Sequence, residues 1–167
     1  MRSKNIIYYV EGGDEQKLIE TLKTGLRVIK PGKVQKLNVM QKLITPARLR
    51  TLKPQTMVVL VFDTDTKTLD VLKKNIEILE SCTAISEIIT IPQVHNLEEE
   101  LVRSCNIRKI TELLNSKSNT EFKSDFIRVS NLDQKLSEHG FNINILWSKQ
   151  PESPYDKIHN QSEKIKL

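Results

Sequence analysis

The sequence contains two cysteines, few aromatic residues and no long apolar run. Cys82 and Cys105 stand outside any CxxC pair and beside apolar helix-forming residues, so we expect reduced thiols and neither a disulfide framework nor a zinc site. Aromatic residues make up 5% of the chain, which argues against a surface built for stacking bases. No run approaches the roughly 20 apolar residues of a membrane span. Residues 1–10 lack the apolar core of a secretory signal, and we therefore expect a cytoplasmic protein that does not associate with membranes.

The 167 residues suffice for one compact domain with its own core, and the net charge of +5 is distributed unevenly along it. Lys23 to Phe62 contains nine basic residues and no acid, whereas Asp63 to Glu112 contains ten acids and six bases. A basic stretch is typical of a solvated face, and also of a track for a phosphate backbone. The candidate nucleic-acid contacts in this stretch are Lys30, Lys33, Lys36, Arg48 and Arg50.

Strand-like apolar runs alternate with helical spacings along residues 1–93. The expected strands are Ile6–Val10, Val34–Met40, Met57–Phe62 and Glu87–Ile91. Met57–Phe62 is continuously apolar, which indicates a central strand covered on both faces. This order predicts an α/β fold with a mostly parallel sheet of about four strands flanked by helices.

Helix-start signals accompany this pattern. Asp14 can cap the helix after the first strand, and Thr45 can cap a short basic helix that has Pro46 at its first position. A third helix is predicted around Leu69 to Leu79 from the spacing of its apolar residues.

The pattern changes after residue 93, which we take as the end of the catalytic core. Residues 94–149 predict a mainly helical extension packed on the same domain. One helix in it is expected to place five apolar residues inward: Phe122, Phe126, Val129, Leu132 and Leu136. One late strand is expected at Phe141 to Trp147, where apolar residues and asparagines alternate. Residues 150–167 contain proline and lysine and predict a loosely ordered tail.

Acidic residues follow two of the predicted strands. Glu11 ends the first, and Asp63 and Asp65 end the central one. The carboxyl ends of parallel strands share one edge of a sheet, and residues two apart in an extended segment project to the same side. Paired carboxylates suit magnesium, which prefers a few hard oxygen ligands. Acids after strands also cap helices, so Asp14 and Asp65 remain candidates for ordinary caps.

The segments VEGGDE and VFDTD resemble the two signatures of the Toprim domain. This is the catalytic module of topoisomerases and primases, and it also occurs in small nucleases such as the overcoming-lysogenization-defect nucleases and the maturase of 5S ribosomal RNA. The resemblance covers about residues 6–93. It implies that Glu11 is a general acid or base, that Asp63 and Asp65 bind magnesium, and that the strands carrying them are adjacent.

Nuclease chemistry is consistent with these residues, because phosphodiester cleavage needs a cation, here magnesium or manganese, and a group that moves a proton. Two-metal nucleases need further acids, and Glu98 or Glu99 can supply them from the helix start at HNLEEEL. A helix start rich in glutamate is equally typical of a solvated helix, because acids interact favourably with its dipole. Lys123 is a candidate for stabilising transition-state charge, and a surface lysine is the alternative.

Two other functions stay open. The DTDT segment is similar to the motif of haloacid-dehalogenase-type phosphatases, in which Asp63 would be the nucleophile and Asp65 the acid. That motif usually opens the chain, and this assignment leaves Glu11 without a role. The second alternative is a Toprim-like module that binds nucleic acid or a protein partner without cutting. The sequence favours a metal-dependent nuclease acting on DNA or RNA, alone or within a larger assembly of undetermined oligomeric state.

Overall fold

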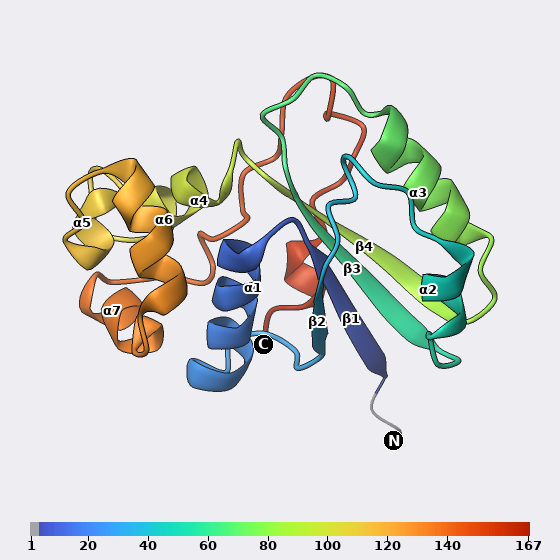
Figure 1. Ribbon diagram of the computed structural model, residues 1–167, viewed down its shortest axis with the longest axis horizontal. Helices are drawn as coiled ribbons and strands as arrows, with labels where there is room; N and C mark the ends of the chain where they lie inside the picture. The colour runs from blue at the N-terminus through green and yellow to red at the C-terminus, as the bar shows by residue number, and fades with distance from the viewer. Residues whose placement is uncertain (1–3) are drawn as a thin grey trace.

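A four-stranded, fully parallel sheet lies between two layers of helices in the computed structural model, which describes residues 4–167 (Figure 1). Its strands run in the order β2-β1-β3-β4. Their bounds are β1 (Asn5–Val10), β2 (Lys33–Lys36), β3 (Thr56–Asp63) and β4 (Ile85–Gln93). The predicted α/β class and the mostly parallel four-stranded sheet are confirmed.

The helices divide between the two faces of the sheet. One face packs against α1 and the α4 to α7 region, and the other packs against α2 and α3 (Figure 1). The helices are α1 (Gly13–Glu20), which continues into the π-helical turn η1 (Thr21–Gly25), α2 (Pro46–Arg50), α3 (Asp70–Glu80), α4 (Leu97–Ser104), α5 (Thr111–Leu114), α6 (Asn119–Arg128), α7 (Leu132–Glu138) and the short 3₁₀ turn η2 (Ser162–Lys164). Within residues 4–167, no helix combines the length and the apolar character needed to cross the hydrocarbon layer of a membrane.

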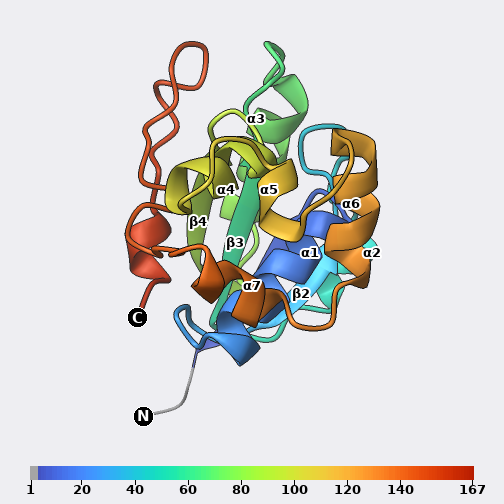
Figure 2. The same cartoon turned by 90° about the vertical axis from the view of Figure 1, so that its left-hand side faces the viewer.

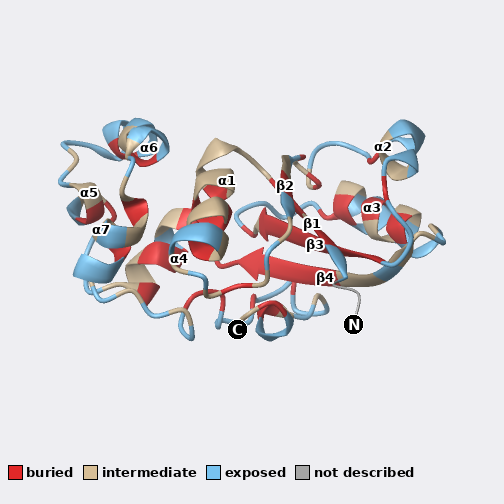
Figure 3. Cartoon of the chain, turned by 90° about the horizontal axis from the view of Figure 1, so that it is seen from below, coloured by how far each residue is buried: buried red, intermediate tan, exposed pale blue. Residues whose placement is uncertain are grey.

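The strand β3 is the centre of the core. All its residues before Asp63 are buried (Figure 3). Val59 and Val61 face the α1 side, whereas Leu60 and Phe62 face the α3 side. A strand buried on both faces needs apolar residues at every position, which explains the uninterrupted apolar run.

The helix starts agree in part with the sequence. Thr45 caps α2 as predicted, because its side chain accepts a hydrogen bond from the Arg48 backbone N–H at 3.3 Å, with Pro46 at the first helical position. The predicted cap of α1 was wrong: Gly12 occupies the N-cap position, and Asp14 lies in the first turn.

Two predicted elements end earlier than expected. The strand β2 stops at Lys36, because Asn38 accepts a hydrogen bond from the Met40 N–H and turns the chain. The single helix expected over Phe122 to Leu136 is broken between α6 and α7, where Val129 is extended and its carbonyl accepts from the Lys17 ammonium group. The apolar residues keep a helical spacing across this break, so the sequence pattern did not reveal it.

The late strand predicted at Phe141 to Trp147 is absent, since these residues form consecutive turns in the structure. Asn142 supplies the reason: its side chain accepts from the Asn144 N–H and its carbonyl from the Ile145 N–H. An asparagine side chain can form such local hydrogen bonds with the backbone, and these compete with the hydrogen bonds between strands of a sheet.

The expectation of a loosely ordered tail was also wrong. Residues 159–164 lie along β4, the edge strand, and cover its outer side (Figure 2). The Thr90 N–H donates to the Gln161 side chain at 3.0 Å, and the Gln161 N–H donates to the Thr90 carbonyl at 2.9 Å. Tyr155 is buried and stacks on Phe62 with 6.5 Å between ring centroids. This segment therefore belongs to the core.

Replacing Tyr155 tests that conclusion. Tyr155→Ala should lower the free energy of unfolding by about 3 kcal/mol, because it empties a fully packed aromatic site. Tyr155→Phe retains the ring and loses only the hydroxyl contact with Thr66, so its cost should be about 1 kcal/mol. Denaturant unfolding measures both values. An unchanged stability of Tyr155→Ala would show that residues 150–167 contribute nothing to the core.

Candidate metal centre

The adjacent parallel strands β1 and β3 bring Glu11 and Asp63 together. Val10 pairs with Val61 in the sheet, so both chains leave it at the same edge. The Asp63 backbone N–H donates to Glu11 Oε1 at 3.1 Å, which joins the two residues directly. The adjacency implied by the Toprim resemblance is therefore present in the fold.

A third carboxylate, Glu15, completes the cluster. It comes from the first turn of α1, is only 4% exposed, and accepts a hydrogen bond from the Gly12 N–H at 3.1 Å. Carboxylate oxygens of Glu11, Glu15 and Asp63 lie within 4.8 Å of one another. We define these three residues as the acidic cluster. Glu15 was not among the predicted site residues, because with Asp14 taken as the cap it is an ordinary acid in the first turn of a helix.

The acidic cluster lacks a neutralising side chain. Among residues 4–167, no lysine, arginine or histidine forms an ion pair with any of its members. Burial and, after it, the charge of Glu11 raise the pKa of Asp63 to about 8. Burial is also the largest cause of the raised pKa values of Glu15 and Glu11.

The composition of the cluster fits a hard divalent cation. Magnesium and manganese prefer carboxylate and water oxygens, and a bound cation would favour the charged form of these carboxylates, whose pKa values are raised mainly by burial. The acidic cluster can therefore bind a metal ion.

Asp65 lies beside the acidic cluster without joining it. It is exposed in the loop after β3, and its carboxylate is not one of the three that lie within 4.8 Å. It does line a cavity of about 360 Å³ together with Glu11 and Asp63. It also lines a second cavity of about 470 Å³ that contains Asp63, Glu98 and Lys123. Asp63 and Asp65 therefore line both cavities.

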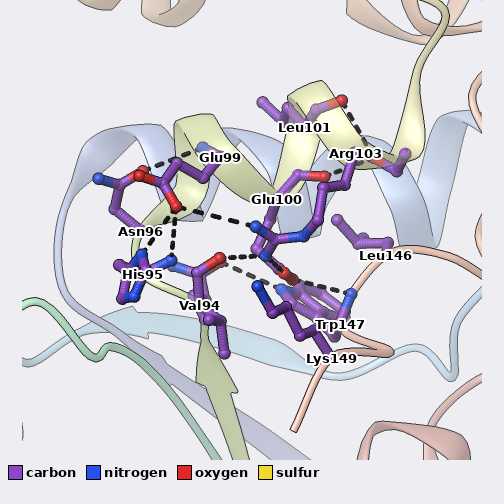
Figure 4. Close-up of polar contacts among 12 residues, drawn as sticks. Val94, His95, Asn96, Glu99, Glu100, Leu101, Arg103, Leu146, Trp147 and Lys149 are labelled. Carbon is purple, nitrogen blue, oxygen red and sulfur yellow. Dashed lines mark hydrogen bonds and ion pairs between the residues drawn. The ribbon is translucent and has the colours of Figure 1, made fainter. Parts of the chain in front are cut away.

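The three glutamates of α4 occupy different surroundings. Glu98 lines the larger cavity and pairs with Lys123 at 3.7 Å. Glu99 lines the same cavity, but its carboxylate contacts the His95 ring at 2.9 Å and lies 3.8 Å from Arg103. Glu100 is buried, and it bonds to Arg103 and to the Trp147 N–H (Figure 4). Of the predicted metal ligands on this helix, Glu98 is therefore the better placed.

The predicted nucleic-acid contacts are dispersed. Lys36 pairs with Val10 and so lies one residue from Glu11, whereas Lys33 pairs with Ile7 towards the opposite end of the strand. Lys33 also lines a separate cavity of about 480 Å³ with Lys53.

The remaining three basic candidates lie elsewhere. The Arg48 guanidinium group stands 5.8 Å from the centre of the Tyr9 ring, and Arg50 is exposed on α2. The backbone of Lys30 bonds to Ile165 in the C-terminal segment. One base that the sequence analysis did not select, Lys109, lines the cavity of about 470 Å³ beside the acids.

Fold and site together define an α/β protein with a partly buried acidic cluster, without an ion-paired cationic side chain among residues 4–167, at the carboxyl edge of a parallel sheet. No protein-family model, curated protein or solved structure matches this chain.

The raised pKa of Asp63 predicts the pH dependence of stability. A carboxyl group whose pKa rises from 3.8 to about 8 on folding binds more protons in the folded chain, so the folded state loses stability as pH increases through that window. In a chelator, wild type should melt at a lower temperature at about pH 8 than at about pH 5. Asp63→Asn should recover about 1 to 2 kcal/mol at the higher pH.

The control is Asp156→Asn. Asp156 is an exposed aspartate that is not part of the acidic cluster. It should leave the pH profile of thermal melting unchanged. If Asp63→Asn is no more stable than wild type at the higher pH, the Asp63 carboxylate is not destabilised by its surroundings.

Proposed function

We propose that this protein is a magnesium- or manganese-dependent phosphodiester hydrolase that acts on nucleic acid. The observation that carries the proposal is the convergence of Glu11, Glu15 and Asp63 into one uncompensated cluster. Asp63 of this cluster and the neighbouring Asp65 line both the cavity of about 360 Å³ and the cavity of about 470 Å³. A chain-like substrate can extend past these two aspartates from one cavity into the other, whereas a small ester needs only one of them.

Each residue has a role consistent with its surroundings. Asp63 and Glu15 would hold the cation. Asp65 and Glu98, which line the cavity of about 470 Å³, would be further ligands. The cation would neutralise the scissile phosphate and acidify an attacking water. Glu11 suits proton transfer, because burial raises its pKa and favours its protonated form. Lys123 and Lys109 line the same cavity and suit contacts with substrate phosphates.

The Toprim resemblance supports this assignment in its residues and in their topology. The glutamate of VEGGDE and the aspartates of VFDTD stand at the ends of neighbouring parallel strands. The phosphatase alternative, with Asp63 as nucleophile, leaves Glu11 and Glu15 without a function and is the weaker proposal.

Cleavage of labelled single- and double-stranded DNA and RNA tests the proposal. Wild type should cut at least one substrate with magnesium or manganese and none in a chelator. Glu11→Gln and Asp63→Asn should each lower the rate at least about a hundredfold, because each removes a group that acts on the reacting phosphate or its water. Glu80→Gln changes an exposed glutamate on α3 and should retain wild-type activity.

Two results would contradict the proposal. One is cleavage that persists undiminished in both site variants. The other is a folded wild-type protein that cuts no substrate with either metal, which would favour a module that binds without cutting.

The salt dependence of nucleic-acid binding tests the proposed phosphate contacts of Lys109 and Lys123. In an Asp63→Asn background, Lys109→Ala and Lys123→Ala should each weaken the binding of a fluorescent oligonucleotide. Each should also reduce the slope of log affinity against log salt by about one, since one phosphate contact is lost.

Lys53→Ala is the matched control, because Lys53 lines the separate cavity of about 480 Å³. Equal effects from all three lysines in fluorescence anisotropy would show that the nucleic acid does not lie in the acidic cavity.

A further inference from the structure

Gln93 is a fully buried polar residue at the last position of β4. Its amide is bonded at both ends. Nε2 donates to Asp63 Oδ1 at 2.8 Å, and Oε1 accepts from the Trp147 indole N–H at 3.1 Å. A buried polar group left without a hydrogen-bond partner is destabilising, so the arrangement in which both ends of the amide are bonded is strongly preferred.

Trp147 determines which way this amide points. An amide side chain can turn over and exchange its oxygen and nitrogen, but an indole N–H can only donate. The Gln93 oxygen must therefore face Trp147, and the NH₂ group must face Asp63. Asp63 therefore accepts a hydrogen bond on Oδ1, whereas its second oxygen, Oδ2, takes part in none of the hydrogen bonds found among residues 4–167.

Trp147 is itself held firmly. Its φ of 56° is uncommon for a bulky residue, and such conformations persist only where the surroundings impose them. Its backbone N–H donates to Glu100 Oε2 at 2.9 Å, and its carbonyl accepts from Ser162 Oγ at 2.9 Å. Figure 4 shows Trp147 and the Arg103 side chain next to Glu100. The helix α4 and the C-terminal segment thus fix the indole from two sides.

We infer that Gln93 is a positioning residue for the cation site, and that the chain from Trp147 through Gln93 to Asp63 sets which Asp63 oxygen meets the metal. This inference rests on the proposed function, because it requires the acidic cluster to bind a divalent cation. Its physical basis is that a ligand fixed by a hydrogen bond on one oxygen loses little orientational freedom on binding. Outer-shell partners of this kind typically change metal affinity 10–100-fold.

Manganese binding to the chelator-stripped full chain tests this role without any substrate, with free Mn²⁺ followed by electron paramagnetic resonance. Gln93→Met keeps the length of the side chain and removes both hydrogen-bonding groups. It should weaken Mn²⁺ binding at least about tenfold. Trp147→Phe removes the indole N–H and releases the amide to turn over, and it should weaken binding in the same direction by a smaller factor.

Thr90→Val is the matched control for a purely structural effect. Thr90 lies on the same strand and is buried, and its hydroxyl donates to the His159 carbonyl at 2.7 Å, away from Asp63. This variant should lose thermal stability and keep wild-type Mn²⁺ affinity. Thermal unfolding of every variant shows that it is folded, and Trp147→Phe decides the question if Gln93→Met does not fold.

The outcomes separate the two proposals. If wild type binds Mn²⁺ and the folded Gln93 and Trp147 variants bind within about twofold of it, the positioning role is overturned and the metal site stands. The same holds if Thr90→Val weakens binding as much as they do. If wild type binds no Mn²⁺, the proposed function fails, and the positioning role fails with it.

Discussion

The site depends on one constraint, which is the repulsion among the carboxylates of Glu11, Glu15 and Asp63. They lie close together, and no lysine, arginine or histidine among residues 4–167 forms an ion pair with any of them. Hydrogen bonds from backbone N–H groups and from the Gln93 amide hold them there. The pairing of β1 with β3, buried on both faces, makes the arrangement rigid. A divalent cation would turn this unfavourable electrostatic term into a favourable one.

Segments beyond the sheet complete the site. The region after β4 lines one cavity with Glu98 from α4, Lys109 from the loop between α4 and α5, and Lys123 from α6. The C-terminal segment fixes Trp147 through Ser162, and its Tyr155 hydroxyl contacts Thr66 in the loop that carries Asp65. The parallel sheet therefore positions the carboxylates, and the surrounding elements determine their orientation and what can approach them.

Much of the fold could be predicted, because its signals are local. A continuous apolar run marked β3, and Thr45 before a proline marked α2. The wrong predictions arose where distant residues or side-chain bonds decided the backbone. Lys17 donates a hydrogen bond to the Val129 carbonyl at the break between α6 and α7. The local hydrogen bonds of Asn142 stabilise turns where a late strand was predicted. Residues 150–167 were predicted to be a loosely ordered tail. Their composition does not reveal that β4 is an edge strand, or that part of this segment packs against it.

The sequence by itself determined the parallel α/β order and the positions of Glu11 and Asp63 at strand ends, because strand periodicity and acid placement are properties of short segments. Only the tertiary structure decided that Glu15 and Gln93 join them and that Asp65 stands apart. It also separated the basic residues, with Lys36 near the acids and Lys33 towards the other end of the strand. The reason is physical: burial and orientation depend on which segments pack together, and residues 11, 63, 93 and 147 meet only after the whole chain has folded.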